Sequence, residues 1–302
     1  MSKALLDTVT RFFQPQRPLW ACEFTSRHLV AAGVDASRKK PAGMMAAALP
    51  SAVLAGSLSE KNILKDPIVF DALKEALGRA GFKGSEISVV IPDDSSRIAF
   101  VNAETLPHGH DEREAFVRWK LKKTVPFDVD AAQIAFRILT PPGSPPVRDV
   151  KNVDLLVALS PRPVVQEYEA LMERLDIHAG CVIPSTLASL NLFRAPKEDV
   201  LFVKTAPGCI TTTIFQDGLP RFYRRVAEMP LYDAVFPTVM YYQDKLDGDG
   251  LRAISVCGYD LDLRRELSEL ETQLGVPVFE LAPDGVEDIF KPALGAANLA
   301  LN

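Results

Sequence analysis

A glycine turn between two β-rich runs is the feature of this sequence that is best suited to do chemistry. Residues 200–203 form a continuous apolar run, Gly208 follows in a turn, and residues 209–215 return as a run rich in Thr and Ile. The backbone N–H groups of such a turn can hold a phosphate, and a neighbouring carboxylate would hold Mg²⁺ beside it. Lys204 precedes the turn instead, and its ammonium group has no lone pair for a metal. The sequence therefore predicts a phosphate-type turn without its metal ligand.

Other residues that could form a site are arranged less specifically. His108, His110 and Asp111 lie in one short polar loop with no second set of ligands, which favours a solvated turn over a metal site. The Asp-Gly-Asp-Gly run at residues 247–250 lacks the bidentate glutamate of a calcium loop. The sequence contains no serine elbow, Cys–His–Asn set or P-loop. We therefore expect no metal site and no catalytic residue.

Composition indicates an ordinary globular chain. Its 302 residues, 47% of them apolar, can bury one large core or two medium ones. A charged fraction of 24% and a net charge of −5 give no basic field that would attract nucleic acid. No signal peptide or membrane-length apolar run is visible, so we expect a cytoplasmic protein. Four cysteines, none of them in a CxxC motif, are expected as buried reduced thiols: Cys22, Cys181, Cys209 and Cys257.

The elements that would position these residues fall into two halves. Each half begins with strands joined by turns and continues in alternating helices and strands, which predicts a mixed α/β fold. In the first half we expect strands at residues 19–24, 29–34, 50–56, 87–91, 98–101, 134–139, 153–159 and 179–183, and helices at 68–82, 111–124, 161–175 and 185–193, the last with Ser185 as N-cap. In the second half we expect strands at 200–203, 209–215, 221–226, 253–257 and 276–281, and helices at 231–246, 261–274 and 286–301.

Two further segments lie outside this repeat. Apolar residues at helical spacing within residues 4–13 predict a helix. Its few basic residues favour docking on its own domain, while a membrane-surface or partner-binding helix stays open as the alternative. Residues 140–149 are rich in proline and predict an exposed loop.

Residues 106–139 carry a resemblance to a known family. They read LPHGHDEREAFVRWKLKKTVPFDVDAAQIAFRIL, an acidic helix followed by a Val-Pro-Phe break, an acidic loop and a strand. This order resembles PilM, the actin-like cytoplasmic protein of type IV pilus assembly, and more distantly FtsA and the cytoplasmic part of GspL. The run ALGAANLAL near residue 301 is similar to the family's closing helix. The resemblance covers residues 19–301.

The resemblance implies an actin-like fold of two RNase H-like lobes. The first lobe would span residues 1–197, with subdomain 1A interrupted by a 1C-type insert at about 95–152, and the second lobe would span residues 198–302. In the family, subdomain 2B is inserted between the hairpin strand and the following helix, but only residues 227–230 remain there. We therefore expect 2B to be reduced or absent, which would remove one wall of an adenine pocket.

The motifs that bind nucleotide in the family are degenerate here. The first phosphate loop has no glycine, Lys204 replaces the aspartate that would hold magnesium, and Tyr259 stands where a second glycine would admit adenine. We expect a pseudo-ATPase without a cofactor and disfavour binding of ATP and magnesium. Because the family's side chains at Glu23 and Lys204 converge on one ion, we expect these two to pair. The residues of the degenerate cleft are Glu23, Thr25, Ser26, Lys204, Gly208, Thr211 and Gly258.

The resemblance also implies a partner. In PilM the groove between subdomains 1A and 1C receives the cytoplasmic N-terminal peptide of PilN, an inner-membrane protein. Phe116, Trp119, Pro126 and Phe127 are candidates to line that groove, with packing in the core as their alternative role. We expect a non-catalytic adaptor of type IV pilus or related type II secretion assembly, held at the inner membrane through a PilN-like tail. Self-association is left open.

Two other functions stay open at this point. A weak actin-like ATPase or kinase would use Glu23, Gly208 and Thr211. An FtsA-like division protein is disfavoured, because FtsA carries a detached amphipathic membrane-targeting helix and none is visible after the final predicted helix. A GspL-like protein would need a transmembrane segment after the domain, which is likewise not seen in these residues.

Overall fold

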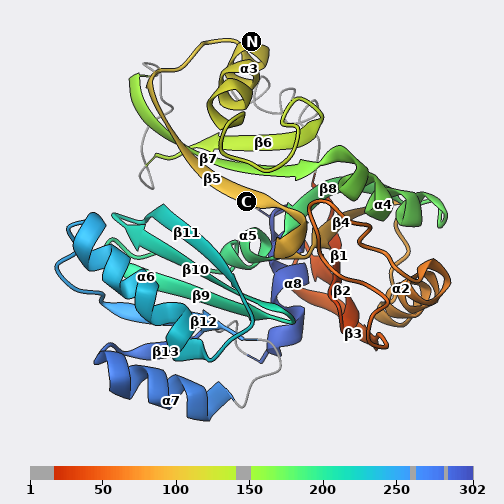
Figure 1. Cartoon of the computed structure of the whole chain (residues 1–302). Coiled ribbons are helices and arrows are strands. Elements are labelled where there is room, and N and C mark those ends of the chain that lie inside the picture. The colour runs from red at the N-terminus through yellow and green to blue at the C-terminus, as the bar shows by residue number, and fades with distance from the viewer. Residues whose placement is uncertain (1–16, 141–150, 259–262, 282–284, 302) are drawn as a thin grey trace, which may run out of the picture.

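Two lobes lie side by side, and a smaller subdomain containing α3 lies beside both (Figure 1). The computed structural model describes residues 17–140, 151–258, 263–281 and 285–301. The helix predicted within residues 4–13, most of the proline-rich loop and Tyr259 fall outside these ranges. Within them, no helix has the length and apolar character needed to span a membrane.

The first lobe is built on a five-stranded sheet of order β3-β2-β1-β4-β8. Its first three strands form an antiparallel meander, whereas β4 and β8 join β1 in parallel. β4 is almost entirely buried, as expected for a parallel strand covered on both faces, whereas the edge strand β8 is mostly partly exposed. The strands are β1 (Trp20–Phe24), β2 (His28–Asp35), β3 (Lys40–Ala48), β4 (Glu86–Ile91) and β8 (His178–Pro184).

The second lobe repeats this topology in a sheet of order β11-β10-β9-β12-β13. Here too an antiparallel meander precedes two parallel strands. Two sheets with the same strand order and no shared sequence pattern confirm the predicted pair of RNase H-like lobes. The strands are β9 (Val200–Ala206), β10 (Cys209–Gln216), β11 (Leu219–Ala227), β12 (Ala253–Cys257) and β13 (Val278–Glu280).

The inserted subdomain is an antiparallel sheet of order β5-β7-β6, with α3 (His110–Leu121) packed on one face. Its strands are β5 (Arg97–Thr105), β6 (Ala132–Ile138) and β7 (Lys151–Pro161). Because β7 is the central strand, this sheet continues past the predicted end of the insert near residue 152. Subdomain 2B is absent as expected, since only residues 228–230 join β11 to α6.

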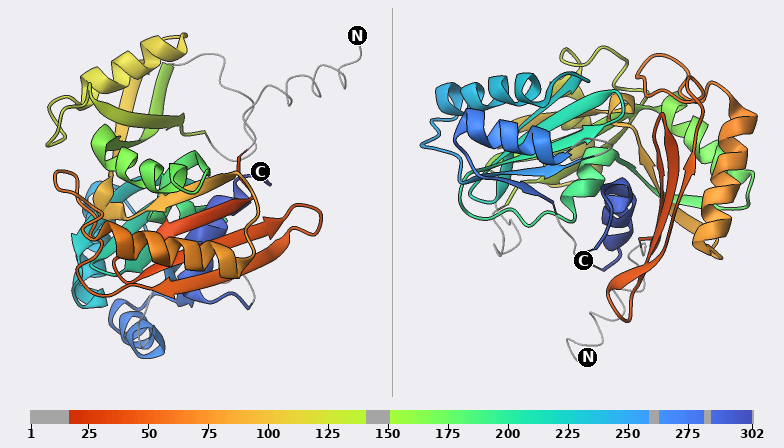
Figure 2. Two further views of the ribbon diagram at one scale, coloured as in Figure 1. Left: turned by 90° about the vertical axis from the view of Figure 1, so that its right-hand side faces the viewer. Right: turned by 90° about the horizontal axis from the view of Figure 1, so that it is seen from below.

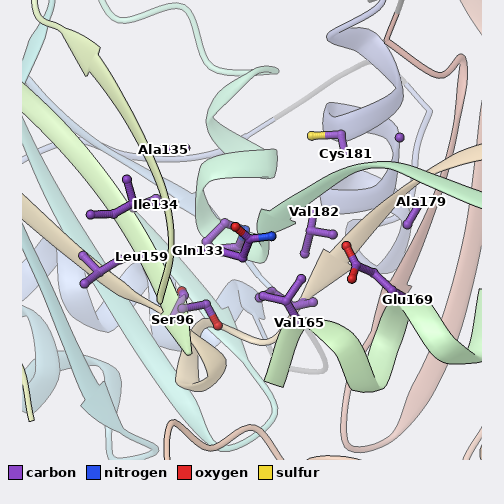
Figure 3. A pocket seen from close by; sticks show the side chains of 15 residues that line it. Ser96, Gln133, Ile134, Ala135, Leu159, Val165, Glu169, Ala179, Cys181 and Val182 are labelled. Atoms are coloured by element: carbon purple, nitrogen blue, oxygen red, sulfur yellow. The ribbon is translucent and has the colours of Figure 1, made fainter. Parts of the chain in front are cut away.

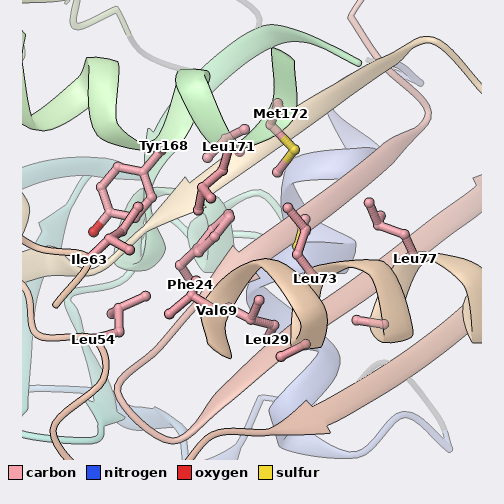
Figure 4. Packing of buried hydrophobic residues seen from close by; sticks show 14 of the residues in the cluster. Phe24, Leu29, Leu54, Ile63, Val69, Leu73, Leu77, Tyr168, Leu171 and Met172 are labelled. Carbon is pink, nitrogen blue, oxygen red and sulfur yellow. The ribbon is translucent and has the colours of Figure 1, made fainter. Parts of the chain in front are cut away.

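Helices cover the sheets and complete the core. In the first lobe, α2 and α4 pack on one face of the sheet, where Phe24, Leu73, Tyr168 and Met172 are fully buried (Figure 4). In the second lobe, α6 and α7 cover the corresponding face. The helices are α2 (Asp66–Ala80), α4 (Arg162–Glu173), α5 (Ser185–Leu190), α6 (Leu231–Lys245), α7 (Leu263–Leu274) and α8 (Lys291–Asn298), with 3₁₀ turns η1 (Asp93–Ser95) and η2 (Asp288–Phe290).

The other face of the first sheet is covered by α8, which lies between the two lobes (Figure 2). Ala21, Val30 and Val90 of the sheet pack against Ala293, Leu294 and Ala297 of this helix. The predicted boundary at residue 198 assigns α8 to the second lobe, yet its contacts are with α5 and with strands β1, β2 and β4. The chain therefore returns to the first lobe after completing the second.

The close packing of α8 on α5 depends on Gly295. A Cβ atom at this position would lie 2.1 Å from the carbonyl oxygen of Ala188. We expect Gly295→Ala to lower the free energy of unfolding by about 1–3 kcal/mol, because the two helices would be forced apart. Gly78→Ala is the matched control, since nothing lies within 4 Å of a Cβ atom at Gly78. This variant should raise the free energy of unfolding by roughly 0.5–1 kcal/mol, because alanine lowers the conformational entropy of the unfolded chain. Urea unfolding of both variants tests the pair, and equal effects would contradict it.

Two local predictions are wrong. The third strand of the first sheet is β3 and not residues 50–56, where the structure has only an isolated bridge between Leu54 and Ile63. β3 is a partly exposed edge strand of Ala, Met and Gly, so it lacks the β-branched residues that mark a strand in sequence. Ser185 is the first residue of α5, and its hydroxyl bonds Glu23 instead of capping the helix.

Candidate functional site

The cleft between the lobes contains a buried ion pair. Lys204 Nζ of β9 lies 3.6 Å from Asp93 Oδ2 of η1, and the two side chains are 3% and 0% exposed. Burial by itself lowers the pKa of Lys204, but the carboxylates of Asp93 and Glu23 more than offset this and raise that pKa above its ordinary value. The ammonium group of Lys204 therefore stays charged within the cleft.

Asp93 is also the centre of a hydrogen-bond network from both lobes. The backbone N–H of Thr186 donates to Asp93 Oδ1 at 2.8 Å, and its hydroxyl donates to Oδ2 at 2.8 Å. Thr186 Oγ1 also lies 2.7 Å from Thr211 Oγ1 on β10. Because the Thr186 hydroxyl has one proton and gives it to Asp93, Thr211 is the donor in this second bond. The carboxylate of Asp93 thus receives two hydrogen bonds from Thr186 of α5 and an ion pair from Lys204 of β9, while Thr211 of β10 bonds Thr186 behind it.

The predicted Glu23–Lys204 pair is wrong. Asp93, and not Glu23, is the carboxylate within ion-pair range of Lys204. Ser185 donates a hydrogen bond to Glu23 Oε1, while Glu23 Oε2 is buried without a partner among the described residues. The sequence did hold a signal for Asp93: it follows the parallel strand β4 at its carboxyl end, where ligand-facing side chains of α/β folds gather.

Burial also shapes the titration of Glu23. It raises the pKa of this carboxyl to about 7, against the smaller opposing effects of Lys204 and the Ser185 hydroxyl. The folded chain therefore holds the proton more tightly than the unfolded chain, whose carboxyl has its ordinary pKa of 4.5. The contribution of Glu23 to the free energy of unfolding is highest below pH 4.5, the pKa of this carboxyl in the unfolded chain. It falls as the pH rises toward about 7, the pKa in the folded chain.

This sign gives a direct test with Glu23→Gln, which keeps an oxygen for Ser185 but cannot ionise. Between pH 5 and pH 8 the wild type should lose on the order of 1–3 kcal/mol of stability relative to the variant. Urea unfolding curves at the two pH values provide the measurement. Parallel pH dependence of the two proteins would show that Glu23 keeps an ordinary pKa in the folded chain.

The predicted nucleotide residues line two very small cavities. Glu23, Thr25 and Ser26 border one of about 30 Å³, and Lys204 and Gly258 border the other, of about 10 Å³, together with Glu23 and Thr25. Sites for small molecules and cofactors typically measure about 300–1,000 Å³. The cleft is therefore filled by protein side chains in this structure.

The glycine turn at Gly208 is also occupied by a protein side chain. Gly208 has a φ of 90°, a conformation that favours glycine, so the turn is built as the sequence predicts. Its N–H donates to Glu228 Oε2 at 3.1 Å. The carboxylate of Glu228 thus accepts the hydrogen bond that this N–H would otherwise donate to a phosphate. Thr211, the other predicted residue near the turn, is buried in the Asp93 network.

A larger pocket of about 250 Å³ lies elsewhere, between the inserted subdomain and the first lobe (Figure 3). We call it the 1A–1C groove. Its walls come from β6 and β7 on one side and from α4 and β8 on the other. Both β6 and β8 are edge strands of their sheets, each paired on one side only among the described residues. The lining residues are Ile91, Ser96, Gln133, Ile134, Ala135, Ala158, Leu159, Ser160, Val165, Glu169, Ala179, Gly180, Cys181, Val182 and Pro184.

One of these edges is irregular. Ala179 pairs with Ile87 and Cys181 with Ser88, so Gly180 is an extra residue that forms a bulge in β8. A Cβ atom at Gly180 would lie 2.3 Å from Oε1 of Glu86, whose exposed side chain would have to move aside. Because a bulge interrupts the row of backbone groups, β6 offers the more regular edge to an extended segment.

The four predicted partner-binding residues do not line this groove. Phe116 and Phe127 are half-buried beside the core on the α3 face of the subdomain sheet, while Pro126 is exposed and Trp119 is 68% exposed. Gln133 and Ala135 line the groove and alternate with Phe136 and Ile138, which pack on the α3 side. Since side chains of a strand alternate between its faces, α3 and the groove lie on opposite sides of the sheet. Partner binding by these four residues remains a prediction.

Comparisons with known proteins show the fold. A scan against protein-family models and a search of curated proteins gave no match. The structure of the PilM-PilN type IV pilus biogenesis complex matches with a TM-score of 0.73 at 16% sequence identity, covering 95% of this chain and 100% of that chain.

Two further structures agree with this result. A protein of actin-like ATPase fold and unknown function from Bacteroides thetaiotaomicron gives a TM-score of 0.52 at 11% identity, covering 92% of this chain and 95% of its own. The cytoplasmic domain of EpsL, an inner membrane component of the type II secretion system of Vibrio cholerae, gives 0.51 at 11% identity, covering 93% and 94%. The chain therefore has the actin-like ATPase fold, with two RNase H-like lobes and an inserted 1C-type subdomain.

Proposed function

We propose that this chain is a non-catalytic, actin-like adaptor that docks an extended cytoplasmic segment of a PilN-like inner-membrane protein. It would serve assembly of a type IV pilus or a related type II secretion machine, on the cytoplasmic side of the inner membrane. The observation that carries the proposal is a contrast between two sites. The 1A–1C groove measures about 250 Å³, whereas the cavities of the nucleotide cleft measure about 30 and 10 Å³.

The groove has the features that an extended peptide needs. Its walls carry aliphatic side chains such as Val165 and Val182, which can bury apolar anchors. The edge of β6, which no described strand pairs with on its outer side, offers backbone groups for strand addition. The similarity in fold to a PilM-PilN complex supports a PilN-like tail as the occupant.

The nucleotide cleft supports the non-catalytic part of the proposal. Lys204 fills the position of a metal ligand with a positive charge, and Asp93 already has its ion pair and hydrogen bonds within the protein. Magnesium would have to displace an ammonium group from a buried carboxylate. We infer that neither ATP nor Mg²⁺ is a cofactor of this chain.

Cys181 provides the experiment for the groove. It lines the groove and is partly exposed, whereas Cys22, Cys209 and Cys257 are buried. A synthetic peptide covering the cytoplasmic tail of a PilN-like protein encoded beside this chain should slow maleimide labelling of Cys181 in proportion to its occupancy. Binding measured by fluorescence anisotropy should give the same affinity. Absence of binding, or binding that leaves Cys181 labelling unchanged, would overturn the proposed docking site.

A calorimetric titration with ATP and magnesium tests the cleft separately. We expect no binding at micromolar nucleotide. Micromolar affinity for Mg-ATP would instead favour a weak actin-like ATPase or kinase and would overturn the non-catalytic assignment.

A further inference from the structure

The 1A–1C groove is apolar along most of its walls but carries one charge. Among the described residues that line it, Glu169 of α4 is the one with an ionised side chain. Val165 lies one helical turn before it, on the same side of α4, and also lines the groove. The carboxylate of Glu169 lies at one side of the pocket and the amide of Gln133 at another, as Figure 3 shows.

Glu169 has no partner among the residues that the structure describes. Neither an ion pair within 4 Å nor a hydrogen bond from these residues reaches its side chain. Arg174, which directly follows α4, pairs with Asp66 through Nη1 at 2.6 Å. Arg137, on the same strand as Gln133, and Arg17, whose charge acts on Cys181, do not form an ion pair with Glu169. The groove therefore presents an uncompensated negative charge beside an apolar surface.

We propose that Glu169 makes the groove selective for a segment that carries a lysine or arginine beside its apolar anchor residues. This inference rests on the proposed function and adds the chemistry of the occupant. An apolar side chain would bury against Val165 and Val182, and the neighbouring cation would pair with the half-buried carboxylate. An acidic residue at the same place would be repelled, so the charge supplies specificity as well as affinity.

The test uses a displayed library of random twelve-residue peptides, selected on the full chain. Wild-type protein should enrich peptides that combine aliphatic residues with Lys or Arg. Glu169→Lys should enrich aliphatic residues with Asp or Glu, and Glu169→Gln should show no charge preference. For a peptide selected on the wild type, Glu169→Gln should weaken binding about tenfold at low salt, and the loss should shrink as salt rises.

Glu173→Lys is the matched control. Glu173 is one turn further along α4, exposed and outside the groove, so its charge reversal should leave the enrichment unchanged. Thermal unfolding of the variants verifies that each is folded. Identical enrichment with wild type, Glu169→Gln and Glu169→Lys would overturn the role of Glu169 while leaving the groove intact. If no selected peptide protects Cys181 from maleimide, the proposed docking site itself fails.

Discussion

Replacing Lys204 with methionine is expected to lower the free energy of unfolding by about 3–5 kcal/mol, because it leaves a buried carboxylate without its counter-ion. Asp93 is fully buried and would keep only its bonds from Thr186. Methionine has a similar length and no charge, so the variant isolates loss of the ion pair from loss of packing. Urea unfolding at pH 7 measures the effect.

Two controls make this result specific to the pair. Lys197→Met removes an exposed lysine seven residues earlier and should change stability by no more than about 0.5 kcal/mol. Lys204→Met combined with Asp93→Asn should cost clearly less than the sum of the two single substitutions, since neither charge is then left alone. A loss below about 1 kcal/mol for Lys204→Met would show that the pair does not stabilise the closed cleft.

Filling the 1A–1C groove should have the largest effect on partner binding. Ala135 lies on the groove side of β6 and is exposed, so a tryptophan there can occupy part of the roughly 250 Å³ pocket without disturbing the core. We expect Ala135→Trp to weaken binding of the PilN-like tail about a hundredfold, because the apolar anchors lose their space. Cys181 in the free variant should also react more slowly with maleimide.

The control for this variant is Ala115→Trp. Ala115 is exposed on α3, on the opposite face of the subdomain sheet, and is not among the groove residues. The Ala115→Trp variant adds the same side chain to the same subdomain and should leave the affinity for the tail unchanged. Wild-type affinity of Ala135→Trp would mean that the tail binds somewhere else on the chain.

The repeated architecture could be predicted because its elements have strong local signals. Buried parallel strands such as β4 and β9 appear as continuous apolar runs, and the turns at Gly208 and Asp217-Gly218 mark the meander of the second lobe. The absence of subdomain 2B could be predicted because the resemblance gives its insertion point, where only residues 227–230 remain. β3 escaped prediction because an edge strand of small residues has no distinctive pattern.

The sites were harder to predict, since they depend on contacts between distant segments. Lys204 was identified as a replacement for a metal ligand, but its partner Asp93 is more than a hundred residues away, in η1, whereas Glu23 lies on β1. Phe116, Trp119, Pro126 and Phe127 suggested a binding surface, yet small and aliphatic residues of β6 and β8 line the groove. The pattern of apolar and polar residues in a single strand does not indicate which face of that strand will pack against another subdomain.

The position of α8 has a consequence for synthesis of the chain on the ribosome. β1 and β2 emerge early, but the helix that covers their second face is made of residues 291–298. Until these residues have been translated, Ala21, Val30 and Val90 present an open apolar surface. The first lobe can therefore reach its final packing only after the second has been made, and the nascent chain is a natural substrate for chaperones that recognise exposed β-strands.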